Sequence, residues 1–114
     1  EGVGGVMAPM TGDQTVADWM AALGLPAILV VGSYLGTLSH TLTAAAALGG
    51  RGIGIAAVIV SESEANPVPL AETTETLGRF LAPVPVLALK RAGGDADRRP
   101  VPEIAAALKV LSAP

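Results

Sequence analysis

Three apolar runs without polar alternation divide the chain. They occupy residues 27–31, 53–60 and 84–89. An unbroken apolar run of this length is typical of a strand that is covered on both faces of a parallel sheet. The third run has Pro85 near its start, and proline cannot donate to a sheet ladder, so this strand is expected nearer an edge. We therefore expect three strands of one parallel sheet.

Apolar residues at helical spacing lie before, between and after the three runs. They predict one helix that ends near residue 23 and further helices over residues 38–48, 70–81 and 101–111. Strands that alternate with helices in this way imply right-handed parallel crossovers. The expected fold class is therefore α/β, with a doubly wound parallel sheet.

The same spacing predicts which side of each helix packs inward and which residue caps it. Asp13 or Thr15 is placed to cap the first helix, and Thr37 or Ser39 the second, because short polar side chains accept from free N–H groups at a helix start. The residues expected to face the core are Val16, Trp19, Met20 and Leu23, then Leu38, Leu42, Ala45 and Leu48, then Leu70, Leu77, either Thr73 or Thr74, and either Phe80 or Leu81.

Residues 1–114 are expected to form a single α/β domain, because a chain of 114 residues can bury one core. A sheet of three parallel strands is small, however, and an open edge favours aggregation. The chain also begins with Glu1-Gly-Val-Gly-Gly5, a tight turn of a kind that normally follows a strand. Both features favour a chain that is the latter half of a larger fold; the alternative for the glycines is a frayed terminus without a role.

Composition argues against several classes of function. The formal net charge of −3 supplies no basic face of the kind that nucleic-acid binding needs. Because the sequence has no cysteine, disulfides and thiolate metal sites are excluded. No apolar run approaches the roughly 18 residues of a membrane span. We expect a soluble, cytoplasmic protein without nucleic-acid or membrane partners.

The stretch from Gly32 to His40 is the first place to look for a binding site. It connects the first strand to the second helix, and ligands of open α/β sheets bind beyond the carboxyl ends of the strands. A helix start at that place offers free N–H groups and positive potential to an anion.

Three segments carry a resemblance to a known family. They are Glu1-Gly-Val-Gly-Gly5, Thr15-Val-Ala-Asp-Trp19, and the stretch from Leu25 to His40 with its Gly-Ser-Tyr-Leu-Gly-Thr-Leu-Ser-His. In order and spacing they resemble the second half of dethiobiotin synthetase, well over about residues 1–64 and weakly beyond. The resemblance implies part of a P-loop NTPase-like three-layer fold whose N-terminal half, which carries the P-loop, is absent from this chain.

The resemblance implies an ATP- and Mg²⁺-dependent ligase of biotin biosynthesis, a homodimer with an active site shared between subunits. Such an enzyme makes the ureido ring of dethiobiotin from 7,8-diaminononanoate and CO₂. One amine is carbamated, ATP phosphorylates the carbamate, and the second amine closes the ring by displacing phosphate. No Gly-x-x-x-x-Gly-Lys-Ser/Thr motif occurs in this sequence, so on this interpretation the chain alone does not perform the chemistry.

The resemblance also implies roles for particular residues. Glu1 would help to hold Mg²⁺, a hard cation that prefers oxygen ligands. Gly4 would let the backbone approach the substrate. Gly36, Thr37 and Ser39 would bind the substrate carboxylate at a helix start contributed by the other subunit.

Two asparagines of the family are serines in this chain. Ser61 stands where the family reads the adenine edge, so it is the implied nucleotide-binding residue, although serine lacks the paired donor and acceptor of an amide. Ser39 stands before the histidine and has a shorter reach. Residues 88–91 replace the family's Gly-Glu-Ile-Pro-like nucleotide loop. These departures favour the alternative function, a non-catalytic relative that dimerises or binds a small acid without hydrolysing ATP.

Other polar residues have both a structural and a functional interpretation. His40 either packs and hydrogen-bonds beside the loop or takes part in catalysis. Glu62 and Glu64 are either solvated carboxylates or metal ligands, and Tyr34 is either exposed or lines the substrate or a dimer contact. The residues expected to form either a solvated basic loop or a phosphate contact are Lys90, Arg91, Arg98 and Arg99.

Overall fold

The computed structural model describes residues 4–94 and 101–112. Its elements are α1 (Val16–Leu23), β1 (Ala27–Val31), α2 (Thr37–Gly50), β2 (Ile55–Ser61), α3 (Leu70–Leu81), β3 (Val86–Leu89) and α4 (Pro102–Ser112). Every expected helix and strand is present, with ends that differ by no more than about two residues. None of the helices in this part of the chain is both long and apolar enough to cross a membrane.

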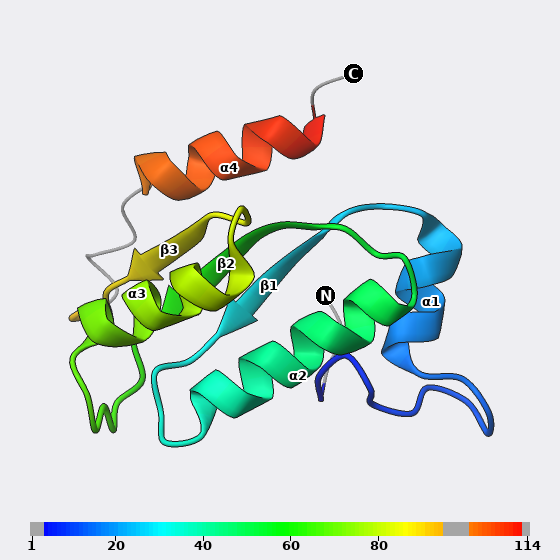
Figure 1. The fold of residues 1–114 in the computed structure, drawn as a ribbon, viewed down its shortest axis with the longest axis horizontal. Helices are drawn as coiled ribbons and strands as arrows, with labels where there is room; N and C mark the ends of the chain where they lie inside the picture. Colours follow the sequence, from blue (N-terminus) through cyan, green and yellow to red (C-terminus); the bar gives the residue numbers. More distant parts are fainter. Residues whose placement is uncertain (1–3, 95–100, 113–114) are drawn as a thin grey trace.

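The three strands form one parallel sheet in the order β1-β2-β3. Residue Val31 of β1 pairs with Val60 of β2, and Ser61 of β2 pairs with Leu89 of β3. Figure 1 shows α2 and α4 on opposite sides of this sheet. The predicted α/β fold with a parallel, doubly wound sheet is confirmed, and β3 lies at an edge as its proline indicated.

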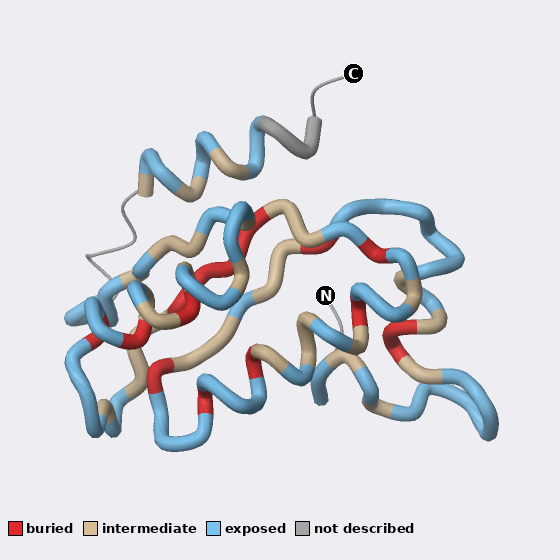
Figure 2. The backbone as a smooth tube through the Cα atoms, viewed as in Figure 1, coloured by how far each residue is buried: buried red, intermediate tan, exposed pale blue. Residues whose placement is uncertain are grey.

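The core is centred on β2, which has a neighbouring strand on each side. Val58 and Val60 are fully buried, and β2 carries the longest buried run of the described chain, while Figure 2 shows shorter buried segments on the helices and loops around it. One apolar cluster joins Val60 to Leu70 and Leu77 of α3. A second joins residues from the start of β1, the end of α2 and the loop before β2, namely Ala27, Leu48 and Ile53.

The expectation that β1 is covered on both faces is wrong for one of its faces. Val30 is 63% exposed, whereas Val31 packs against the cluster around Val60. Successive side chains of a strand point to opposite faces, so Val30 lies on the face away from α2 and α3. The helix on that face, α4, packs mainly against β2, so Val30 stays exposed while Ile28 on the same face is half-buried.

The expected inward face of α1 is also partly wrong. Val16 and Ala17 are buried and Met20 packs against the cluster around Ala27, but Trp19 is 46% exposed and Leu23 is exposed as well. Residues advance by about 100° around a helix, so a face centred on Val16, Ala17 and Met20 turns Trp19 to the flank.

The predicted inward face of α2 is largely confirmed. Leu48 is buried, Leu42 packs against the cluster around Val60, and Ala45 is half-buried, but Leu38 is exposed. Thr37 and Thr41, which were not predicted to face inward, are buried as well.

Two choices were left open for the inward face of α3. Of Thr73 and Thr74, Thr73 is the buried residue. Of Phe80 and Leu81, Leu81 packs against the cluster around Val60 and Phe80 is 68% exposed.

Candidate functional site

The carboxyl ends of the three strands form one rim of the sheet. Because the order is β1-β2-β3, the segment after β2 lies between the segments after β1 and β3. Three of the predicted site residues, Gly36, Thr37 and Ser39, follow β1, and Ser61 is the last residue of β2. The structure therefore brings these four residues to the same edge of the sheet.

A tight turn leads from β1 into α2. The Thr37 N–H donates to the Tyr34 carbonyl over 3.1 Å, and Gly36 has φ 93° and ψ −6°. These are the features of a type II turn, which needs a positive φ at its third residue and hence glycine. The Thr37 hydroxyl donates back to the Gly32 carbonyl, so both ends of the loop are tied together.

The predicted capping of α2 by Thr37 or Ser39 is wrong. Gly36 is the N-cap and makes no side-chain cap, and Thr37 is the first helical residue with its hydroxyl turned to Gly32. A side-chain cap is not needed for the Thr37 and His40 N–H groups, because Tyr34 and Gly36 carbonyls accept from them. For α1, Thr15 is the cap, in a reciprocal capping box with Asp18, and Asp13 is not.

The first turn of α2 keeps two free donors. Within the described part of the chain, no acceptor is paired with the N–H groups of Leu38 and Ser39. The first turn holds no acidic residue, and Ser39 is exposed. The start of a helix carries positive potential from its aligned peptide dipoles. This corner of the rim can therefore accept a carboxylate or another anion.

Tyr34 and His40 pair beside this turn. The Tyr34 hydroxyl and His40 Nδ1 are 2.9 Å apart, and the two ring centroids are separated by 5.7 Å. The tyrosine is 40% exposed, so the pair lies at the surface of the rim. His40 thus has a hydrogen-bonding partner next to the loop. This agrees with a packing and hydrogen-bonding role for His40, the structural alternative to catalysis.

The segment after β2 is bonded to the segment after β3. The Arg91 N–H donates to Glu62 Oε2 over 2.9 Å, and the Glu62 N–H donates to the Leu89 carbonyl. The Arg91 guanidinium lies 3.8 Å from Glu64 Oε2 in an exposed ion pair. Both glutamates are thus engaged with Arg91. Arg98 and Arg99 of the basic loop lie outside the described residues.

The predicted metal ligand, Glu1, also lies outside the described residues. Gly4 is described, exposed and in a left-handed conformation with φ 91°. In the described residues no three His, Cys, Asp or Glu side chains gather as a metal site would require. The side chains described here therefore do not form a complete Mg²⁺ site by themselves.

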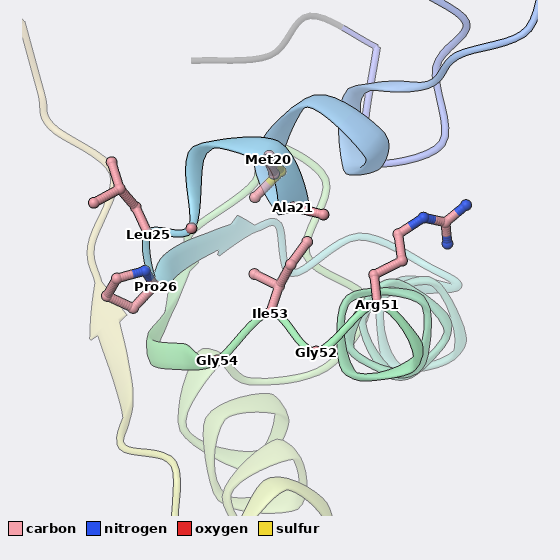
Figure 3. Close-up of a pocket in the computed structure, with 9 residues that line it drawn as sticks. Met20, Ala21, Leu25, Pro26, Arg51, Gly52, Ile53 and Gly54 are labelled. Atoms are coloured by element: carbon pink, nitrogen blue, oxygen red, sulfur yellow. The ribbon is translucent and has the colours of Figure 1, made fainter.

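A hollow of about 280 Å³ lies at the opposite edge of the sheet, beside the amino ends of β1 and β2. Leu25, Pro26, Ile53 and Arg51 are among its lining residues, and Figure 3 shows the Arg51 side chain extending away from the other three. Arg51 Nε instead donates to Asp18 Oδ1 over 3.2 Å. The hollow is separate from the rim and contains none of the predicted site residues.

Ser33 and Ser63 belong to the rim but were not among the predicted site residues. Each N–H donates to the other's Oγ, over 3.0 and 2.9 Å, although the residues are 30 positions apart in the chain. A faint signal exists in the sequence, since each serine follows its strand at the same distance. Serine is too common in loops for that spacing to single out a contact.

A family model described as "AAA domain" matches residues 1–90. The chain belongs to this AAA-domain family. Curated relatives are named ATP-dependent dethiobiotin synthetase BioD, as the three segments of the sequence indicated. The relative from Acidiphilium cryptum is 54% identical over 85 residues, which cover 75% of this chain. The relative from Caulobacter vibrioides is 53% identical over 93 residues, or 82% of this chain.

A further relative, from Phenylobacterium zucineum, is 47% identical over 112 residues, or 97% of this chain. The matched regions make up 38%, 42% and 48% of the three relatives. This AAA-domain chain thus spans less than half the length of these synthetases. The resemblance to the second half of dethiobiotin synthetase agrees with the names of these relatives and with the fraction of each relative's length that this chain matches.

Proposed function

We propose that the complete protein containing this chain is a dethiobiotin synthetase, and that this chain supplies its carboxylate-binding rim. The observation that carries the proposal is the pair of free N–H groups of Leu38 and Ser39, at the start of a 14-residue helix without an acidic residue in its first turn. Relatives 47–54% identical that are named ATP-dependent dethiobiotin synthetase support the same choice. The substrate 7,8-diaminononanoate carries one carboxylate, which suits this corner.

The hydrogen bonds of the loop suggest a separate role for each of its residues. Leu38 and Ser39 donate to the substrate carboxylate. Gly36 supplies the turn, and Thr37 holds the loop closed because its hydroxyl is bonded to Gly32. Removing one good charge-assisted hydrogen bond to a carboxylate weakens binding by about ten- to a hundredfold.

ATP and Mg²⁺ belong to the proposal for the whole protein. Mg²⁺ bound beside phosphates neutralises the charge that develops as a phosphoryl group is transferred. Within this chain, Glu1 is the proposed ligand and Ser61 the proposed contact to the nucleotide base. Carbamation of one amine by CO₂, phosphorylation of the carbamate and attack by the second amine then yield the ring, ADP and phosphate.

We also propose that the protein is a cytoplasmic homodimer in which the rim of one subunit completes the site of the other. The apolar surface beside the turn supports a subunit contact, because Leu35 is 85% exposed and Tyr34 and Leu38 are exposed next to it. Exposed apolar side chains that gather at one place are typical of interaction surfaces.

The test uses the complete gene product, with ring formation measured as dethiobiotin released from diaminononanoate, CO₂ and ATP. We expect turnover in the wild type and its loss in Glu1→Gln. Ser39→Asp places a negative charge at the first turn, where it favours the helix but repels the substrate carboxylate. Its KM for the diamino acid is expected to rise at least tenfold while its KM for ATP stays unchanged.

Calorimetry separates this proposal from the non-catalytic alternative. Binding of the diamino acid together with ATP to the complete wild-type protein supports the synthetase. If the protein binds the acid and does not bind or hydrolyse ATP, the non-catalytic function replaces it. Undiminished turnover in Glu1→Gln would overturn the role assigned to that residue.

A further inference from the structure

Ser33 and Ser63 form a reciprocal bridge between two strand exits. The Ser33 N–H donates to Ser63 Oγ over 3.0 Å, and the Ser63 N–H donates to Ser33 Oγ over 2.9 Å. The strands β1 and β2 have already ended at Val31 and Ser61. Two side-chain hydroxyls therefore continue the linkage between the chains after the backbone ladder has stopped.

The surroundings of this serine bridge are closely packed. Ser33 is fully buried. A Cβ added at Gly32 would lie 2.7 Å from Ser63 Oγ and 2.6 Å from Cδ1 of Tyr34, closer than real Cβ atoms approach. Glycine at this position thus allows the Ser63 hydroxyl to reach the β1 exit. The bridge is a built feature of the fold and not a surface contact.

The bridge fixes the first residues of the loop that leads to α2. Gly32 precedes Ser33 and its carbonyl accepts from the Thr37 hydroxyl, so the same short segment is held by Ser63 on one side and by the start of α2 on the other. The type II turn at Gly36 lies between these two attachments. A shift of Ser33 would therefore move the turn and the free N–H groups of Leu38 and Ser39.

The other end of the bridge is held as well. Glu62, which precedes Ser63, accepts from the Arg91 N–H, and its own N–H donates to Leu89. The segment after β2 is consequently fixed to β3 before it meets the segment after β1. Ser61, the proposed nucleotide contact, lies two positions before Ser63 on this same segment.

We propose that Ser33 and Ser63 are positioning residues for the carboxylate-binding turn, and that their bridge sets the place of the Leu38 and Ser39 N–H groups relative to the β2 exit. This inference rests on the proposed function for the identity of the ligand. In this role the two serines act through the turn and do not themselves donate to the substrate. Loss of a hydroxyl leaves the partner's amide without its acceptor in a partly buried place, and the loop then relaxes toward other conformations.

The test compares Ser63→Ala, Ser33→Ala and the double variant with wild type in the complete gene product. Thr74→Ala is the matched control, because it removes a hydroxyl hydrogen bond to a backbone carbonyl, that of Leu70 over 2.8 Å, in α3 away from the rim. We expect each serine variant to raise the dissociation constant and the KM for diaminononanoate about tenfold. The dissociation constant for ATP and the kcat at saturating diamino acid stay within about twofold of wild type.

Both bonds serve one linkage, so the double variant is expected to weaken substrate binding by less than the product of the two single effects. Effects that multiply would show that the two serines act independently, and equal changes in Thr74→Ala would show general destabilisation. Either result overturns the proposal. A second measurement does not depend on activity: amide hydrogen exchange across residues 32–39 should become faster in Ser63→Ala and unchanged in Thr74→Ala.

The failures of the two proposals have different signatures. If the wild-type protein forms no dethiobiotin and binds no diamino acid, the proposed function fails, and the exchange measurement still decides whether the serine bridge orders the loop. If wild type turns over and both serine variants keep its dissociation constant and exchange rates, the positioning role is wrong.

Discussion

At the scale of single residues, the rim is shaped by what small side chains permit. Gly36 supplies a positive φ of 93° for the turn, and Gly32 leaves room for the Ser63 hydroxyl. Thr37 is buried, and its hydroxyl donates a hydrogen bond to the Gly32 carbonyl. These residues offer no reactive group themselves. They determine where the backbone donors of Leu38 and Ser39 point, so substitutions at them should act through geometry.

Gly36→Ala is expected to destabilise the protein by about 1–2 kcal/mol, because an L-residue in the left-handed region is strained. Space is not the cause, since the nearest atom to an added Cβ, in the His40 ring, lies at 3.5 Å. Gly49→Ala is the control. Gly49 lies within α2 with nothing near an added Cβ, so alanine there should stabilise by about 0.5 kcal/mol. Urea unfolding of the two variants gives both values, and equal values would contradict the role of φ at Gly36.

Two neighbouring threonines of α3 make a second residue-scale test. The hydroxyl of Thr73 is buried and has no hydrogen-bond partner among the described residues, whereas the Thr74 hydroxyl donates to the Leu70 carbonyl over 2.8 Å. Thr73→Val should therefore stabilise by about 1 kcal/mol and Thr74→Val should destabilise by about 1 kcal/mol. Thermal unfolding of both variants provides the comparison. A loss of stability in Thr73→Val would indicate that its hydroxyl has a partner in solution.

At the scale of elements, apolar spacing predicted the existence and type of every helix and strand in the described part of the chain, but not which side chains at the flank of a helix face are buried. Trp19, Leu38 and Phe80 each belong to a periodic apolar set and each is exposed. Periodicity gives a face roughly a third of a helix wide, and the neighbouring layer decides which side of that face is buried. In α2 the residues buried against the neighbouring layer include Thr37 and Thr41. A hydrophobicity pattern does not distinguish these threonines from surface residues.

The start of α1 gives an element-scale prediction about pH. Hydrogen bonds from the backbone N–H and hydroxyl of Thr15, and then the Arg51 guanidinium, lower the pKa of Asp18 below its ordinary value of 3.8. The folded protein therefore holds a proton on Asp18 less tightly than the unfolded chain does. Its contribution to stability is present above about pH 3.8 and is lost as the pH falls through the lower folded pKa.

The variant Asp18→Asn removes this titration while keeping an acceptor for the capping box. We expect wild type to be the more stable of the two above about pH 5, with the difference shrinking toward pH 2. High salt should reduce the difference, because the carboxylate is exposed to solvent screening. Urea midpoints of both proteins across this range are the measurement. A difference independent of pH would show that Asp18 acts without its charge.

At the scale of the whole molecule, the place of the candidate site was predicted from the sequence, whereas much of its internal bonding was not. A helix start after a buried strand pointed to residues 32–40, because ligands of α/β sheets bind at that edge. The roles proposed for Gly36, Thr37 and Ser39 come from the resemblance. The serine bridge joins residues 30 positions apart, and local patterns do not encode such a contact. The chain spans less than half the length of the three synthetases described above, so a complete active site is proposed only for the whole protein.

The proposed sharing of the site between subunits makes a prediction that a site within one subunit does not. Glu1→Gln impairs the metal side and Ser39→Asp the carboxylate side. At a diamino acid concentration well below the wild-type KM, each variant dimer alone is therefore expected to keep about a tenth of wild-type activity or less. In a mixed dimer, one site combines both defects and the other combines Glu1 of one variant with the intact α2 start of the other. Random mixing makes half of the dimers mixed, so about a quarter of wild-type activity should return when equal amounts are unfolded and refolded together. Each variant refolded alone is the control, and an inactive mixture from variants that form mixed dimers would place both residues of a site in one subunit.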